Sequence, residues 1–250
     1  MTMTTTRVED LTPITRAEAP QLAAAEHQRV LELLQTLTDA DWAQPTECEL
    51  WDVRAMAGHM LGMMEGFAAF PQWVHQMRAG GKAAGDGPFI DGMTAVQVRE
   101  RADLTVEQLL ERVAIAGPRA ARARGRVPAP FRHLPLKEAV GGKTETWRLG
   151  YLLDVILTRD PWMHRGDITR ATGREHVLTP EHDGRIVADV VAEWARRHGR
   201  PFTLELEGPA GGTFQHGDGG ERTTLDAVEF CRILSGRAVG TDLLSTEVPF

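Results

Sequence analysis

Apolar residues recur at intervals of three and four over most of the first 175 positions, which is the spacing of one buried helix face. This pattern predicts helices over residues 15–38, 52–77, 94–101, 105–126 and 144–172. Thr15, Asp52 and Thr105 are suited to cap the first, second and fourth of these helices. Pro71 should kink or break the second helix. Two stretches should be irregular because of their glycines and prolines: 80–92 and 126–142.

The pattern changes after residue 175. A further amphipathic helix is expected over residues 180–199, and residues 202–207 alternate strictly between apolar and polar, which predicts a half-buried strand. Another helix should cover residues 226–236, and residues 243–250 should form a strand or a docked tail. We therefore expect a mainly α protein with a small α/β C-terminal domain. Its expected parts are a flexible segment over residues 1–15, a four-helix bundle over 16–175 and the α/β domain over 176–250.

Composition limits which binding partners and which cellular location are expected. The formal net charge is −7 and no basic stripe runs along the chain, so nucleic acid is not an expected partner. The densest cationic run, residues 119–126, is read either as a solvated helix end or as an anion-binding patch. Cys48 and Cys231 lie too far apart for a disulfide framework or a cysteine zinc site. No apolar stretch could span a membrane and no signal peptide is recognisable, so a cytoplasmic protein is expected.

Three residues in the predicted bundle are candidate metal ligands. Asp160 and His164 are four positions apart, which places a carboxylate and an imidazole on one helix face. His59 lies on a mostly apolar face of the second helix and should point into the bundle core. If these two helices are neighbours, the three side chains can hold one divalent ion, zinc fitting the donor set best, with a fourth position open. Asp167 could orient the His164 ring.

Each of these residues also has a structural interpretation. Asp160 and His164 could be an ordinary helix pair, and His59 a buried neutral histidine bonded to a carbonyl. Cys48 lies close to the candidate site in sequence, but a buried structural cysteine is the simpler interpretation. The spacing alone leaves these alternatives open.

Three segments of the chain carry a resemblance to a known family. Residues 46–54 followed by His59, residues 159–173, and residues 225–237 with 248–250 resemble, in this order, the DinB-like, maleylpyruvate isomerase family of mycothiol-dependent enzymes. The resemblance implies a DinB-like four-helix bundle with a divalent metal at its centre, followed by an α+β accessory domain. The chain departs from the family pattern by having Asp160 where many relatives have glutamate, and by having Pro161 after it.

The resemblance also implies a chemistry. A metal with an open position can bind a low-molecular-weight thiol such as mycothiol and lower its pKa, so that the thiolate attacks a small electrophilic substrate. An isomerase or an S-transferase is the expected activity. The alternatives are a hydrolase that uses metal-bound water, and a binding protein that retains the fold without turnover. Arg237 is predicted to hold a substrate or cofactor anion, with a surface salt bridge as the alternative. A monomer or a homodimer is expected.

Overall fold

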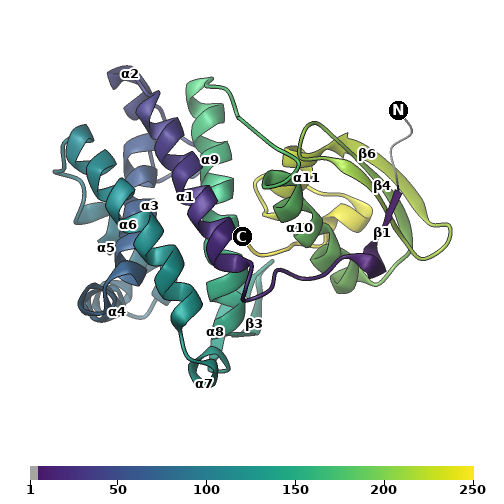
Figure 1. The fold of residues 1–250 in the computed structure, drawn as a ribbon, viewed down its shortest axis with the longest axis horizontal. Helices are drawn as coiled ribbons and strands as arrows, with labels where there is room; N and C mark the ends of the chain where they lie inside the picture. The colour runs from purple at the N-terminus through teal and green to yellow at the C-terminus, as the bar shows by residue number, and fades with distance from the viewer. Residues whose placement is uncertain (1–4) are drawn as a thin grey trace. The chain divides into compact units, whose positions relative to one another are not determined.

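The computed structural model describes residues 5–250, and the chain forms two compact units. The first, here called the helical unit, consists of Arg16–Phe131 and Asp160–His176. The second, here called the mixed unit, consists of Met1–Thr15 (described from Thr5), Arg132–Arg159 and Val177–Phe250. The expected fold class, mainly α with a small α/β part, is confirmed (Figure 1). None of the helices within residues 5–250 is long and apolar enough to cross a membrane.

Four long helices supply the core of the helical unit. They are α1 (Ala19–Gln35), α3 (Val53–Ala68), α6 (Val106–Arg126) and α9 (Leu157–Thr172), which belongs to this unit from Asp160 onward. A short helix, α2 (Asp39–Trp42), follows α1. The buried side chains of one contiguous cluster come from all five helices, and include Leu34, Trp42, Met60, Val113 and Ile168. α3 packs on α6 and α6 on α1 (Figure 1). The apolar faces predicted from the sequence therefore meet in one core.

The predicted helix starts are correct at two of three places. The Asp52 carboxylate accepts a hydrogen bond from the Ala55 amide at 2.7 Å, and Thr105 forms a capping box with Gln108. The cap predicted at Thr15 is wrong, because α1 begins at Ala19 without a side-chain cap. Pro20 lies in its first turn, where the missing N–H has no helical partner to lose.

Helices α4 (Phe70–Ala84) and α5 (Phe89–Arg99) pack against each other beside α3. The break predicted at Pro71 is confirmed, since the chain is extended at Ala69 between α3 and α4. The predicted loop over residues 80–92 is wrong except at 85–88. Its glycines serve helix contact instead: a Cβ on Gly80 would lie 2.9 Å from Met93 Cα, and one on Gly92 would lie 2.3 Å from the Gly80 carbonyl oxygen.

The mixed unit is built on a four-stranded sheet of order β1-β5-β4-β6. The strands are β1 (Thr5–Arg7), β4 (Phe202–Glu207), β5 (Gly212–His216) and β6 (Glu221–Asp226). β1 is parallel to β5, β5 antiparallel to β4, and β4 parallel to β6. Helices α10 (Asp183–His198) and α11 (Ala227–Leu234) contribute Trp194 and Phe230, whose rings lie 5.3 Å apart and pack with buried strand residues.

The expectation of a flexible segment over residues 1–15 is wrong for the described part. Thr5–Arg7 is a strand of the sheet, a 3₁₀ turn covers Val8–Asp10, and the Ile14 amide donates to Asp189 on α10 at 3.0 Å. Threonines are common in strands, and here they extend a sheet whose other strands lie 200 residues further along the chain. Residues 1–4 lie outside the described part.

The chain between the two halves of the helical unit also differs from expectation. After a short helix, α7 (Ala129–Arg132), strands β2 (Pro135–Val140) and β3 (Lys143–Arg148) form an antiparallel hairpin. Its turn is Gly141–Gly142, both with positive φ, as tight hairpins require. The helix predicted from residue 144 therefore begins only at α8 (Leu149–Tyr151). A π-helical segment, Leu152–Ile156, then leads into α9.

The C-terminal segment is a docked tail and not a strand. A 3₁₀ turn covers Asp242–Ser245, and the Val248 amide then donates to the Leu234 carbonyl at 2.9 Å. The Pro249 carbonyl accepts from the Arg159 guanidinium at 3.1 Å.

A buried histidine should make the helical unit sensitive to acid. His27 Nδ1 lies 2.9 Å from the Gly117 carbonyl oxygen, and Nε2 has no hydrogen-bond partner among the described residues. Burial, reinforced by the nearby Arg124 charge, lowers the pKa of His27 to about 4. Because the unfolded histidine has a pKa of about 6.5, its contribution to stability is complete above that pH and is lost as the pH falls through 4.

His27→Gln should therefore flatten the acid side of the stability profile. Between pH 7 and pH 4, the free energy of unfolding should fall by up to about 3 kcal/mol more in the wild type than in the variant. This follows from the lowering of the His27 pKa from 6.5 to about 4 on folding. Urea unfolding at a series of pH values measures this difference. His75→Gln, which changes an exposed histidine of α4, is the control and should follow the wild type. Parallel profiles for wild type and His27→Gln would contradict the assignment.

Candidate metal centre

His59 is held in one orientation by a neighbouring amide. It lies in the middle of α3, where its side chain is buried. Its Nδ1 lies 2.8 Å from Gln97 Oε1 on α5. An amide oxygen only accepts, so Nδ1 carries the proton and Nε2 is left with a lone pair. That nitrogen faces Asp160, with Nε2 and Oδ2 3.7 Å apart.

His164 is held in the same way from the opposite helix. Its Nδ1 lies 3.0 Å from Oδ2 of Asp167, one turn further along α9, and Asp167 is fully buried. The Nδ1 proton is therefore directed at Asp167, and Nε2 lies 3.4 Å from Asp160 Oδ1. The helix continues through Pro161, so Asp160 and His164 remain one turn apart on one face. The structure thus brings together the three residues singled out from the sequence, with Asp167 behind one of them.

The donor atoms of this cluster fit a divalent metal ion. Ligands about 2.0–2.1 Å from a tetrahedral zinc lie about 3.4 Å from one another. His164 Nε2 lies 3.4 Å from Asp160 Oδ1 and His59 Nε2 lies 3.7 Å from Asp160 Oδ2, so each histidine nitrogen is near that spacing from one carboxylate oxygen. Asp160 Oδ2 is buried and accepts no hydrogen bond within residues 5–250. A buried carboxylate oxygen without a donor is costly, and a cation would satisfy it.

The charges of the cluster stabilise one another without a metal. Burial by itself would raise the pKa of Asp160, but His164 and His59 hold it well below its ordinary value. Burial by itself would lower the pKa of His164, but Asp160, Asp167 and Cys48 raise it well above its ordinary value. Without a metal, the Asp160 carboxylate is therefore ionised and a protonated His164 balances its charge; a bound cation would take the place of the His164 Nε2 proton.

Trp51 forms one wall of the site. Its ring centroid lies 4.8 Å from that of His59 and 5.9 Å from that of His164. The two imidazoles are perpendicular to each other, with centroids 5.3 Å apart. The indole thus packs against both rings and limits their movement.

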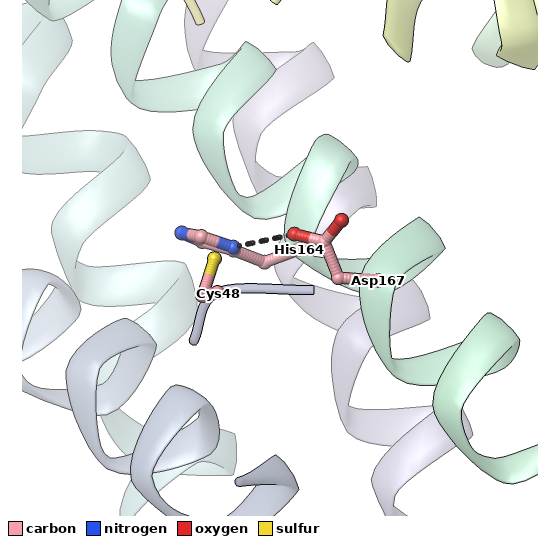
Figure 2. Close-up of side chains that lie close together, drawn as sticks. All are labelled: Cys48, His164 and Asp167. Carbon is pink, nitrogen blue, oxygen red and sulfur yellow. Dashed lines mark hydrogen bonds and ion pairs between the residues drawn. The ribbon is translucent and has the colours of Figure 1, made fainter. Parts of the chain in front are cut away.

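A second group of possible donors overlaps the first. Cys48, His164 and Asp167 present ligand atoms within 4.8 Å of one another. Figure 2 shows the three side chains close together. Cys48 is half-buried and lies beside the His164 ring, whose Nδ1 bonds to Asp167. A metal in this group would have to replace that hydrogen bond, whereas the group of His59, Asp160 and His164 would use the two Nε2 atoms, which face Asp160, and would keep the bonds of both Nδ1 atoms.

The remaining predicted site residue lies in the other unit. Arg237 follows α11, and its amide donates to the Arg232 carbonyl at 3.0 Å while its guanidinium lies 3.3 Å from Ser235 Oγ. Its predicted role as an anion-binding residue stays a prediction. Gln97, which binds His59, was not singled out from the sequence. It belongs to another helix 38 residues away, and nothing in local spacing marks it.

Fold and site together define a mainly helical protein with a buried cluster of two imidazoles and one carboxylate, built from α3 and α9. The family model for the mycothiol maleylpyruvate isomerase N-terminal domain matches residues 23–169, more than half of the chain. The chain belongs to this family, which is named for an enzyme. The resemblance seen in the sequence is thereby confirmed, and His59, Asp160 and His164 all fall within the matched region.

Solved structures agree on the fold. The chain is similar to the mycothiol-dependent maleylpyruvate isomerase and to a variant of that protein with alanine in place of a histidine. In each case the identity is 15%, the TM-score is 0.55, and the match covers 93% of this chain and 92% of the other. The likeness therefore extends over both units. No curated protein matches the chain.

Proposed function

We propose that the chain is a metal-dependent isomerase that uses mycothiol or a similar low-molecular-weight thiol, with a zinc ion held by His59, Asp160 and His164. The observation that carries the proposal is the convergence of two histidine Nε2 atoms on one carboxylate, with both Nδ1 protons already bonded elsewhere. A bound divalent ion would supply a Lewis acid that lowers the pKa of a coordinated thiol. Family membership supports the thiol and a small-molecule substrate.

The proposed substrate is a small cis-alkene acid of the maleylpyruvate type, as the names of the family and of the similar structures suggest. The cofactor thiolate would add to one alkene carbon, forming a C–S bond while the π electron pair of the alkene moves onto the conjugated carbonyl as an enolate. This leaves a C–C single bond that can rotate. Expulsion of the same thiolate would restore the double bond as the trans isomer, so the thiol is regenerated. If the reaction stops at the adduct, the same site is an S-transferase.

In this scheme the residues of the cluster and their neighbours bind the metal ion and fix the orientation of its ligands. His59 and His164 present one nitrogen each, fixed by Gln97 and Asp167. Trp51 packs against both rings and keeps water from that side of the cluster. Asp160 supplies the negative charge that balances the cation.

The test of the proposal is turnover of maleylpyruvate by the zinc-loaded protein with and without mycothiol. We expect trans product only when the thiol is present, with no net consumption of thiol. Consumption of one thiol for each substrate would indicate S-transfer. Equal rates of substrate hydrolysis with and without thiol would replace the proposal with a hydrolase, and substrate binding without turnover would replace it with a binding protein.

Arg237 is proposed to bind the carboxylate of the substrate or of the cofactor. Arg237→Ala should then raise KM for the anionic ligand by about 10- to 100-fold, the range expected for losing a charge-assisted hydrogen bond, while bound zinc stays unchanged. Steady-state kinetics with zinc analysis measure both. Arg196→Ala, which removes another arginine of the mixed unit, is the control. An unchanged KM for both substrate and thiol would return Arg237 to a structural role.

A further inference from the structure

A chain of buried hydrogen bonds starts at His59 and runs through Gln97 and Gln76 to the Gly62 carbonyl. Gln97 Nε2 donates to Gln76 Oε1 at 3.1 Å, and Gln76 Nε2 donates to the Gly62 carbonyl at 2.8 Å. Each of the two glutamine residues is 3% exposed, which is unusual for an uncharged amide side chain within a helix contact. The chain of bonds crosses from α5 to α4 and ends on the backbone of α3, the helix that carries His59.

The backbone end fixes the direction of every bond in this chain. A carbonyl oxygen only accepts, so Gln76 must turn its NH₂ group toward Gly62 and its oxygen toward Gln97. Gln97 must then turn its NH₂ group toward Gln76 and its oxygen toward His59. The last acceptor requires a proton on His59 Nδ1, which leaves Nε2 unprotonated in the neutral ring.

Two glycines of α3 make room for these amides. A Cβ on Gly62 would lie 2.6 Å from Gln97 Cβ, and one on Gly66 would lie 2.7 Å from Gln76 Oε1. Both distances are well below van der Waals contact. Any larger residue would therefore displace the glutamine side chains, so the two positions serve the bond chain and not the apolar core.

We propose that Gln97, itself oriented by Gln76, is a positioning residue that fixes the tautomer of His59 and so presents Nε2 for metal binding. The inference rests on the proposed metal site, and it adds residues from α4 and α5 to it. Groups that hold the far nitrogen of a metal-binding histidine commonly contribute 10- to 100-fold to metal affinity. The Arg101 guanidinium donates to the Gln97 carbonyl at 2.9 Å and steadies its backbone.

The test is zinc affinity, measured by competition with a chromogenic chelator, in Gln97→Met and Gln97→Glu. Methionine has about the same length but cannot accept the Nδ1 proton, so its affinity should fall about 10- to 100-fold. Glutamate accepts that proton and should keep the affinity within about threefold of wild type. If Gln97 had only a structural role, zinc affinity would not be lower in Gln97→Met than in Gln97→Glu. Gln72→Met places the same substitution on α4 outside the bond chain and should bind zinc like wild type.

Gln76→Met provides a second test if Gln97→Met does not fold. It leaves Gln97 in place but allows its amide group to rotate by half a turn and present NH₂ to His59, so zinc affinity should fall several-fold. Wild-type affinity in a folded Gln97→Met or Gln76→Met protein would overturn the inference and leave the proposed function standing. Wild-type protein that binds no zinc, or His59→Ala that binds it normally, would overturn the metal site itself.

Discussion

His59→Ala protein is expected to fold, to bind zinc more than about 100-fold more weakly than wild type, and to lose isomerase activity by a similar or larger factor. The reason is that His59 is one of the three proposed protein ligands, whereas groups that merely orient a metal ligand already contribute about 10- to 100-fold. Asp160→Asn should have a comparable effect, because it removes the negative charge between the two imidazoles while keeping the shape of the side chain.

Metal analysis after dialysis and thiol-dependent turnover are the two measurements. His75→Ala, which truncates an exposed histidine on α4, is the matched control and should keep both metal and activity. Stoichiometric zinc in both His59→Ala and Asp160→Asn would show that the ion binds elsewhere. Cys48, His164 and Asp167 would then be the next group to test.

The second large effect is expected in the mixed unit, at Arg159. This side chain is completely buried and donates to Asp189 at 2.6 Å, to Glu193 at 2.9 Å and to the Pro249 carbonyl. Arg159→Met keeps most of the volume but leaves the buried Asp189 carboxylate without its cation, whereas Glu193 keeps its ion pair with Arg197 at 2.8 Å. Removing one partner from a buried ion pair typically costs about 3–5 kcal/mol, so the free energy of unfolding should fall by that amount.

Urea or thermal unfolding followed by circular dichroism measures this loss. Arg7→Ala is the control, because Arg7 pairs with Glu9 and Asp218 on the surface of the same unit, where such pairs contribute about 0–1 kcal/mol. A loss of less than 1 kcal/mol in Arg159→Met would mean that the Asp189 carboxylate finds another partner.

The helical core and the candidate metal-ligand residues could be predicted from the sequence because both follow from local spacing. Asp160 and His164 are neighbours on any helix, and His59 lies on a helix face whose apolar residues must be buried. The family resemblance then placed α3 and α9 together, which spacing alone could not do. Strand β4 and the caps at Asp52 and Asp226 were equally predictable from alternation and side-chain type.

What escaped prediction depends on contacts between distant segments. Strand β1 is too short to be recognised before its partner β5, some 200 residues later, is known. Gly80 and Gly92 have the composition of a loop, yet they permit the close approach of two helices. Gln97 carries no signal of its own, because its role appears only when α5 lies beside α3. The hairpin of β2 and β3 was missed because β3 runs directly into α8, and no loop residues separate the strand from the helix.

A crystal structure of the zinc-loaded protein, with anomalous data collected at the zinc edge, would show directly which residues bind the ion. We expect one strong peak about 2.0–2.2 Å from His59 Nε2, from His164 Nε2 and from an Asp160 oxygen, with the Gln97 and Asp167 bonds to the two Nδ1 atoms intact. A peak bound instead by Cys48, His164 Nδ1 and Asp167, or no peak at this cluster, would contradict the proposed metal site.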